Sequence, residues 1–367
     1  MAARTRLQKL QELLTTEKID CAIVIPGPNL YYLTGLKMHL SKRVTCCFIQ
    51  VDRDPVFVLP MLEKPSAERT IQVPARFYSY MDGEGMASAM EQVVNELQLK
   101  GKRISVEHEL MRLFELKELE RYLSSSSFLR LEDTLGRLRI IKDAEEILLM
   151  RRAIEITENV LHQTIKYIKP GLTESDVARF FQRTALEQPI DGFSFSPIVV
   201  SGPNGGSPHA APGDRVISKG DMVTIDCGVF YKGYPGDITR NVAIGRADPE
   251  LEKAHLILEE ANAAGRAASQ PGVAVGEIDR VTRAVIERAG YGQYFIHRTG
   301  HGLGLEIHEP PYIIPGGALL LEPGMTFTIE PGIYIPGKGG ARVEDNMLIT
   351  ERSAETLTQY PRALTRI

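Results

Sequence analysis

Acidic residues in apolar, strand-like segments are the feature of this chain that most directly suggests chemistry. Asp226 lies within Val223-Thr-Ile-Asp-Cys-Gly-Val, and Asp237 follows eleven residues later. Strand interiors disfavour aspartate, and a buried carboxylate is costly unless it is paired or bound to a metal. The segments 222–231 and 237–244 are typical of a hairpin. We therefore predict that Asp226 and Asp237 lie nearly opposite each other across it.

The same anomaly recurs near the end of the chain. Glu330 ends the apolar run Thr326-Phe-Thr-Ile-Glu, and Glu344 stands in the strand-like run 341–349. Four acids on the apolar strands of one domain would repel one another at pH 7, so they predict cations between them. Carboxylates with one imidazole favour two divalent ions such as Mn²⁺, Co²⁺ or Zn²⁺, held about 3.5–4 Å apart. Such ions activate a bridging water, so the predicted reaction is a hydrolysis.

Four histidines lie where they could join this site. His297, His301 and His308 occur in one Gly-rich stretch, Phe295-Ile-His-Arg-Thr-Gly-His-Gly-Leu-Gly-Leu-Glu-Ile-His, and His209 lies apart in a loop rich in Gly and Pro. The glycines disfavour a helix here, and the HExxH zinc motif is absent from the sequence. Each residue also has a structural interpretation when it is taken alone. A strand aspartate can be an edge residue, His209 a plain loop residue and His297 a core residue.

The elements that would position these groups fall into two domains. Residues 1–133 alternate helical and strand patterns and are typical of an α/β domain. Residues 134–367 are typical of an α+β domain with an antiparallel sheet. Asp143, with Glu146 three residues later, predicts the start of a long helix. Further elements are expected as helices over 249–268 and 276–289, and as strands over 295–297, 325–330 and 341–349.

Composition excludes several classes of protein. The 367 residues contain 43 Lys and Arg and 47 Asp and Glu, and this net charge of −4 argues against a dedicated nucleic-acid binder. The sequence has no run of 18 apolar residues that would predict a membrane span, and its charged start lacks the apolar core of a signal peptide. The four cysteines include an adjacent pair and no CxxC, which is a poor disulfide framework. We therefore expect a cytoplasmic protein with reduced thiols.

Together these residues resemble the metallopeptidases with the pita-bread fold, which comprise methionine aminopeptidase, Xaa-Pro aminopeptidase, prolidase and the related creatinase. Residues 134–367 are similar to the pita-bread catalytic domain, and residues 1–133 are similar to the creatinase-type N-terminal domain. That extra domain indicates the branch of prolidase and Xaa-Pro aminopeptidase. The resemblance implies a peptidase that cleaves Xaa-Pro bonds at a free N-terminus, in peptides with proline at the second position, and it implies a homodimer.

The resemblance also assigns metal ligands. Asp226 would bind one ion, Asp237 and Glu344 would bridge two ions, and His301 and Glu330 would complete the second. Glu330 would in addition transfer a proton during the reaction. The implied nucleophile is a hydroxide that bridges the two ions, and we expect manganese, with cobalt or zinc as alternatives.

Four further residues match family positions around the metals. His209, His297 and His308 would hold the substrate, stabilise the oxyanion or move a proton. Arg342 would brace the metal ligands or the substrate, and its structural alternative is a plain ion pair with a neighbouring acid.

One position departs from the family pattern. Some prolidases carry an arginine four residues past the histidine that matches His308, where it suits the free carboxylate of a dipeptide. This chain has Tyr312 there. The sequence therefore leaves open whether the enzyme is a dipeptidase or an aminopeptidase. The histidine and the basic residues of the loop 34–43 are a second source of charge, because in a dimer this loop could approach the active site of the partner.

Two other functions remain open. A related C–N hydrolase could act on a non-peptide substrate, as creatinase does, but creatinase works without the metal set that is intact here. A non-catalytic binding protein on the same fold is the second alternative, and such relatives usually lose metal ligands.

Overall fold

The computed structural model describes residues 2–123 and 125–367, and the chain divides into two compact units at Arg139 and Ile140. The boundary expected between 133 and 134 falls inside helix α6 (Glu132–Arg139), the last element of the first unit. The hydroxyl of Thr134 donates to Glu17 Oε2 (2.5 Å), which ties α6 to the first helix of this unit. Within the described ranges, no helix combines the length and apolar character that a membrane crossing requires.

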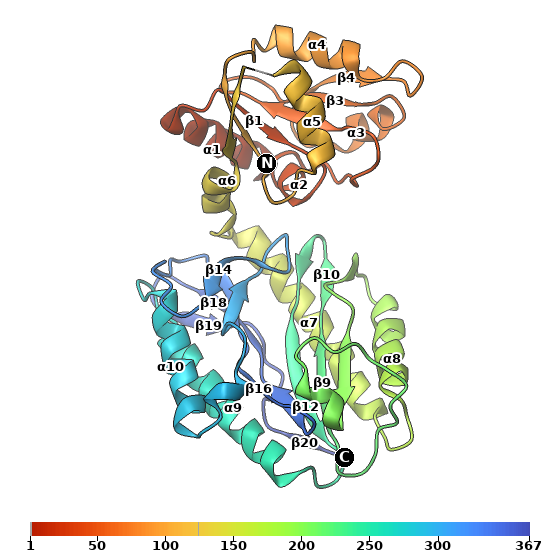
Figure 1. Ribbon diagram of the computed structural model, residues 1–367, viewed down its shortest axis with the longest axis vertical. Coiled ribbons are helices and arrows are strands. Elements are labelled where there is room, and N and C mark those ends of the chain that lie inside the picture. The colour runs from red at the N-terminus through yellow and green to blue at the C-terminus, as the bar shows by residue number, and fades with distance from the viewer. Residues whose placement is uncertain (1, 124) are drawn as a thin grey trace. The chain divides into compact units, whose positions relative to one another are not determined.

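The first unit is a mixed six-stranded sheet with helices around it (Figure 1). Three of its strands, 21–24, 46–49 and 56–60, are short apolar runs that are fully buried, which is expected for the part of a sheet that is covered on both faces. In sheet order the strands are β4 (Arg76–Tyr80), β3 (Val56–Pro60), β2 (Cys46–Ile49), β1 (Cys21–Val24), β5 (Arg103–Val106) and β6 (Ser127–Arg130). The other helices are α1 (Ala2–Glu17), α2 (Pro28–Thr34), α3 (Lys64–Thr70), α4 (Ala87–Glu96) and α5 (Leu113–Tyr122).

The second unit contains two halves, each with a pair of helices and a sheet. Helices α7 (Ala144–Tyr167) and α8 (Glu174–Leu186) pack on a four-stranded sheet, and α9 (Pro249–Ala268) and α10 (Val275–Arg288) cover the other half (Figure 1). The first sheet runs β20 (Thr365–Arg366), β12 (Ile238–Ala243), β9 (Met222–Cys227) and β8 (Ile198–Ser201). The second runs β14 (Glu309–Ile313), β13 (Gly300–Gly302), β15 (Thr326–Ile329), β18 (Asp345–Ile349) and β19 (Ala354–Thr356).

Smaller elements connect these layers. Two short sheets consist of β11 (Tyr234–Pro235), β10 (Val229–Tyr231) and β7 (Gly192–Phe193), and of β16 (Gly332–Ile335) and β17 (Gly339–Arg342). Two 3₁₀ turns, η1 and η2, cover Gly202–Gly206 and Gly292–Tyr294.

Helix α7 begins as the sequence predicts. The Asp143 side chain accepts from the Glu146 amide (2.9 Å), and the Glu146 carboxylate accepts from the Asp143 amide (2.9 Å), which completes a capping box. The buried face of the helix carries apolar residues at helical spacing, among them Met150, Ile154 and Val160. Val160 packs on the sheet that carries Asp226, whereas Ile154 contacts Leu348 of β18 in the other half.

The register between β9 and β12 differs from the predicted one. Asp226 pairs with Thr239 rather than with Asp237. The reason is the turn, in which Lys232 and Gly233 both have positive φ (49° and 85°), so the hairpin is centred on these two residues. Asp237 lies two residues from Thr239, so it is a diagonal neighbour of Asp226 on the same face of the sheet.

Two other predicted strands are wrong in part. Residues 295–297 form no strand, because the carbonyls of Phe295 and His297 accept from the Arg283 guanidinium (3.1 Å each) instead of from a neighbouring strand. The run 341–349 is not one strand but the end of β17 and the whole of β18, which belong to different sheets. Glu344 lies in the break between them.

Glycines let β13 run unusually close to its two neighbouring strands. A Cβ at Gly300 would lie 1.9 Å from the Thr328 carbonyl oxygen of β15, and one at Gly302 would lie 2.2 Å from the Pro310 carbonyl oxygen of β14. These obstacles are backbone atoms, which cannot rotate away. The strand that carries His301 therefore requires glycine on both sides of the histidine.

We predict that Gly300→Ala lowers the free energy of unfolding by about 1–3 kcal/mol, because the added methyl group forces β13 away from β15. Urea denaturation measures this. Gly213→Ala is the matched control, since its Cβ would meet nothing closer than 3.7 Å, and its effect should stay within about 0.5 kcal/mol. Equal stability of the two variants would contradict this account of β13.

Candidate metal centre and active site

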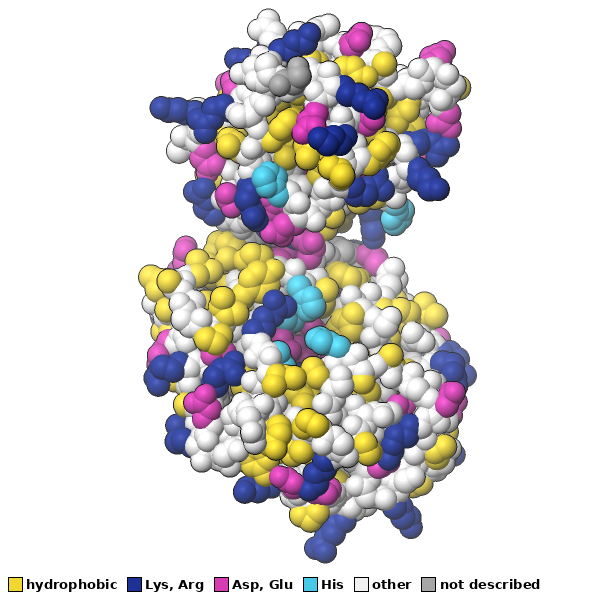
Figure 2. All heavy atoms as spheres, in the orientation of Figure 1, with side chains coloured by type: hydrophobic (Ala, Val, Ile, Leu, Met, Phe, Trp, Pro, Cys, Tyr) yellow, Lys and Arg dark blue, Asp and Glu magenta, His cyan; other side chains and the backbone are white. Residues whose placement is uncertain are grey.

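A cavity of about 650 Å³ opens in the second unit, and all nine residues that the sequence singles out line it. Its wall also carries apolar side chains from β8 and from the segments before and after it: Phe195, Ile198, Pro208, Ala210, Ala211 and Pro212. On the face of this unit drawn in Figure 2, histidine side chains surround a hollow that contains acidic groups. A polar, charged floor with an apolar wall is typical of a small-molecule or peptide site.

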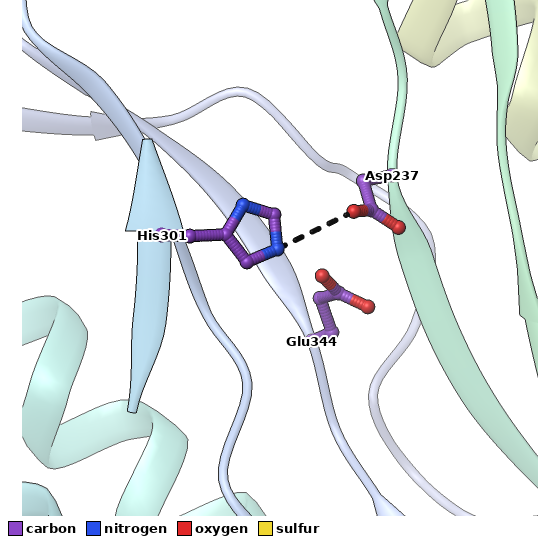
Figure 3. A group of neighbouring side chains, drawn as sticks. All are labelled: Asp237, His301 and Glu344. Atoms are coloured by element: carbon purple, nitrogen blue, oxygen red, sulfur yellow. Dashed lines mark ion pairs between the residues drawn. The ribbon is translucent and has the colours of Figure 1, made fainter. Parts of the chain in front are cut away.

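Three of these residues form a tight group of potential metal ligands. One donor atom each from Asp237, His301 and Glu344 lie within 4.8 Å of one another, and all three side chains are buried. Figure 3 shows that they point toward one another from separate segments of the chain. Asp237 stands at the start of β12 in the first half, whereas His301 on β13 and Glu344 before β18 come from the second. The cluster therefore forms only when both halves pack together.

The imidazole of His301 presents a lone pair to these acids. Its Nδ1 lies 3.1 Å from the Gly302 carbonyl oxygen, which can only accept, so Nδ1 carries the proton. Burial, followed by the nearby charge of His308, lowers the pKa of His301 to about 3, so the ring is neutral at pH 7. The unprotonated Nε2 then faces Glu330 Oε1 at 3.3 Å and Asp237 Oδ2 at 3.8 Å. When the acids are ionised, acceptors that face one another in this way repel, and a cation between them relieves the repulsion.

The acids themselves are crowded. Burial, followed by repulsion from Glu344, raises the pKa of Asp237 well above its usual range. Burial and repulsion from Glu330 raise the pKa of Glu344 in the same way. Burial raises the pKa of Glu330 to about 7. These shifts mean that the carboxylates resist ionising together unless positive charge joins them.

Orphaned oxygen atoms support the fit to a divalent ion. Asp226 Oδ1 and Asp237 Oδ1 are buried and have no hydrogen-bond partner among the described residues. A buried carboxylate oxygen without a partner is costly, and it is the ligand that a hard divalent cation prefers. The donor set of carboxylates with one neutral imidazole therefore fits metal binding.

A chain of hydrogen bonds lies beside this cluster. Arg342 Nη2 donates to Asp226, and Arg342 Nη1 donates to the Tyr334 hydroxyl (2.7 Å), which lies 3.0 Å from His297 Nε2. His297 Nδ1 is bound to the Arg298 carbonyl oxygen (2.7 Å), so Nε2 accepts from Tyr334. Burial, followed by the charge of Arg342, lowers the pKa of His297 to about 4, which keeps this ring neutral.

Arg342 contacts the predicted metal ligand Asp226, and it does not pair with an acid next to it in the sequence, which was the structural alternative. Tyr334 was missed, because a tyrosine in an apolar strand looks like an ordinary core residue. The sequence carries no local signal for this role, because only the structure shows that Tyr334 is 4% exposed and that its hydroxyl meets His297 and Arg342.

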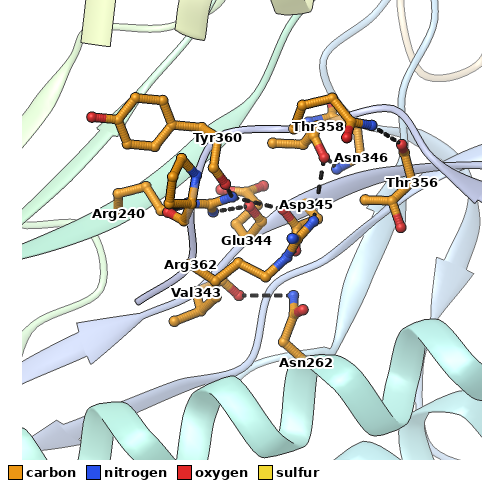
Figure 4. A network of polar contacts seen from close by, with 12 residues as sticks. Arg240, Asn262, Val343, Glu344, Asp345, Asn346, Thr356, Thr358, Tyr360 and Arg362 are labelled. Atoms are coloured by element: carbon orange, nitrogen blue, oxygen red, sulfur yellow. Dashed lines mark hydrogen bonds and ion pairs between the residues drawn. The ribbon is translucent and has the colours of Figure 1, made fainter. Parts of the chain in front are cut away.

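A second polar network holds Glu344 (Figure 4). Its Oε2 accepts from the Thr239 hydroxyl (2.7 Å), and its backbone carbonyl accepts from Arg240 (2.5 Å). The neighbouring Asp345 is fully buried and accepts from Arg240 (2.8 Å) and Arg362 (2.7 Å). These contacts fix the backbone in the break between β17 and β18. Glu344 is therefore held at its carboxylate by Thr239 and at its backbone by Arg240.

The two remaining histidines lie at the outer part of the cavity. The ring of His308 meets that of His301 edge-on, with centroids 4.2 Å apart. Burial, followed by the charges of Arg298 and His209, lowers the pKa of His308. His209 is exposed on the loop after η1. Both can therefore reach a bound substrate from the side of the opening.

Comparisons with known proteins agree with this architecture. The family model described as metallopeptidase family M24 matches residues 148–351, and the creatinase/prolidase N-terminal domain matches residues 6–141. These matches confirm the fold class expected from the sequence, a creatinase-type N-terminal domain followed by a metallopeptidase catalytic domain.

Solved structures are similar over nearly the whole chain. A dipeptidase from Pyrococcus horikoshii OT3 is 38% identical, with a TM-score of 0.93 over 99% of this chain and 100% of that chain. A prolidase from Thermococcus sibiricus is 33% identical, with a TM-score of 0.95 over 100% of both chains. An Xaa-Pro dipeptidase from Bacillus anthracis is 29% identical, with a TM-score of 0.90 over 100% of both chains.

The pKa shifts predict how pH affects the metal-free protein. Glu330 titrates near 7 when folded and near 4.5 when unfolded, so between these values the folded state binds more protons and stability falls as pH rises. Asp237 and Glu344 shift in the same direction. Mn²⁺ relieves the repulsion, so it should raise the melting temperature more at about pH 8 than at about pH 5.5. Thermal melts with chelator and with Mn²⁺ test this.

The control for this prediction is Glu330→Gln, which removes one of the shifted carboxyls. Its metal-free form should lose less stability between the two pH values than the unaltered protein does. A shift by Mn²⁺ that is the same at both pH values, or larger at the lower one, would contradict the prediction.

Proposed function

The chain belongs to metallopeptidase family M24, a family of metal-dependent peptidases, and on that premise we propose that it is an Xaa-Pro dipeptidase. The observation that carries this proposal is the convergence of buried carboxylates and the neutral His301 from both halves of the unit in one cavity. The names of the similar structures, a dipeptidase, a prolidase and an Xaa-Pro dipeptidase, support the choice of substrate.

We propose that Asp226, Asp237, His301, Glu330 and Glu344 hold two divalent ions, with Mn²⁺ as the expected metal. The mainly hard oxygen donors favour Mn²⁺, and one imidazole is compatible with it. Ions bound there would polarise the scissile carbonyl and lower the pKa of a nearby water. Support for these ligands comes from Asp237, His301 and Glu344, whose donor atoms lie within 4.8 Å of one another.

The side chains of this chain would then move the protons. Glu330 lines the cavity beside His301, so its carboxylate would accept a proton from the attacking water and later release it. The proline nitrogen lacks a hydrogen in the peptide, so it must be protonated before it can leave. His308 would donate a hydrogen bond to the developing oxyanion. Both ring nitrogens of the neutral His297 are engaged, by the Arg298 carbonyl and by the Tyr334 hydroxyl, so His297 would act on the site by holding Tyr334 in place. The acids would also attract the free N-terminal amine.

We extend the proposal to the setting of the enzyme, a cytoplasmic homodimer. Cys21, Cys46, Cys47 and Cys227 are free and buried, which suits a reducing compartment. The homodimer follows the family expectation, and light scattering of the full chain measures it.

We predict that the protein in Mn²⁺ hydrolyses Ala-Pro, cleaves Ala-Ala at a rate at least about tenfold lower, and loses activity in chelator. Asp237→Asn should reduce kcat/KM by about 100-fold or more and bind less Mn²⁺ per chain, because a bridging ligand is lost. Glu277→Gln, at an exposed acid on α10, is the matched control and should behave as the unaltered protein does.

Chromatography measures the two rates of hydrolysis, as proline released from Ala-Pro and as alanine released from Ala-Ala. Binding of Mn²⁺ without hydrolysis of any Xaa-Pro peptide would refute the peptidase assignment and favour the related C–N hydrolase on a non-peptide substrate. Absence of both metal binding and hydrolysis would favour a non-catalytic binding protein.

A further inference from the structure

The active-site cavity contains two arginines in different situations. The guanidinium of Arg342 is already hydrogen-bonded within the protein, because it donates to Asp226, to Tyr334 and to the Thr239 hydroxyl. Arg298 also lines the cavity, yet among the described residues its guanidinium forms no ion pair with an acid. Its positive charge is therefore available to pair with an anionic group of a ligand.

The contact that Arg298 does make leaves its donors available. Its guanidinium carbon lies over the ring of Tyr312, 4.8 Å from the centroid. A guanidinium stacked on an aromatic face keeps its N–H groups directed outward in the plane, where two of them match the two oxygens of a carboxylate. Tyr312 thus supports the cation without neutralising it.

The backbone on both sides of Arg298 is fixed. The Thr299 amide donates to the Ile313 carbonyl (3.0 Å), and the Thr299 hydroxyl donates to Asp279 (2.7 Å). On the other side, the His297 carbonyl accepts from Arg283 (3.1 Å). A cation on such a clamped segment loses little freedom when it binds an anion.

The cavity is also polarised. Its buried floor holds the acids, whereas Arg298 is half-buried and close enough to His308 for its charge to act on that ring. A dipeptide is a zwitterion with its amine at one end and its carboxylate at the other. With the amine drawn to the acids, the free carboxylate would extend toward the arginine.

We propose that Arg298, held by Tyr312, binds the C-terminal carboxylate of the substrate and thereby selects dipeptides over longer peptides. This proposal rests on the proposed Xaa-Pro dipeptidase function. Tyr312 would then support the cation Arg298, whereas some prolidases carry the arginine itself at the position of Tyr312.

The competing source of charge is the loop 34–43. Arg43 in that loop is already paired, because its Nε and Nη2 donate to the Asp82 carboxylate at 2.7 and 2.6 Å. Lys42 is exposed. Variants of these two residues therefore form a separate arm of the experiment.

The experiment compares Ala-Pro with Ala-Pro amide, which differ only in the carboxylate, using the full chain in Mn²⁺. The unaltered protein should prefer Ala-Pro in kcat/KM by about 10- to 100-fold, as expected for a charge-assisted hydrogen bond. Arg298→Met should lose this preference mainly through a higher KM for Ala-Pro, and its rate on the amide should stay within about threefold. Arg298→Lys should keep part of the preference, because it retains a point charge.

Arg280→Met is the matched control, since it removes an arginine that is 67% exposed on α10, and it should keep the full preference. If Arg298→Met does not fold, Tyr312→Leu replaces it and should lower the same ratio by about three- to tenfold.

An Arg298→Met protein that retains the preference overturns the proposal, as does loss of the preference in Lys42→Ala or Arg43→Ala instead. Hydrolysis of both substrates at equal rates by the unaltered protein also overturns it but leaves the peptidase function standing, whereas hydrolysis of neither refutes the function itself.

Discussion

The neutral His301 ring, whose Nε2 lone pair faces carboxylate oxygens inside a buried cavity, is the constraint on which the rest of this structure depends. Acceptors cannot bond to acceptors, and burial removes the water that would otherwise satisfy them. When the carboxylates are ionised, a cation between the groups is what stabilises the arrangement. Every other feature of the site can be understood as a means of holding these acceptors at that spacing.

The fold holds them by using both halves of the second unit and by surrounding the ligands with fixed donors. Asp237 directly precedes β12 in one half, whereas His301 on β13 and Glu344 before β18 come from the other half. The glycines of β13 allow close approach of its neighbours, and buried arginines brace the acids: Arg342 binds Asp226, and Arg240 binds the backbone of Glu344. Loss of one partner would leave a buried charge unpaired, so these contacts matter more than surface ion pairs of equal length.

The metal ligands and the start of α7 could be predicted from the sequence, because the residue types involved are unusual at their positions. Acids in apolar strands stand out, and the capping box at Asp143 is a local signal that does not depend on the rest of the fold. The register of β9 and β12 could not be predicted in the same way, since it depends on whether Lys232 adopts a positive φ. The break at Glu344 and the roles of Tyr334 and Arg298 depend on tertiary contacts, because each residue type is ordinary at its position in the chain.

The central proposal is that the acids of both halves and His301 together bind divalent cations. Crystals of the full chain grown in Mn²⁺ and measured near the manganese absorption edge test it most directly. The account predicts anomalous peaks in the cavity, within about 2.0–2.6 Å of carboxylate oxygens of Asp237 and Glu344 and of His301 Nε2. A fully occupied manganese site elsewhere, with His301 Nε2 protonated and bound directly to an acid, would contradict the claim.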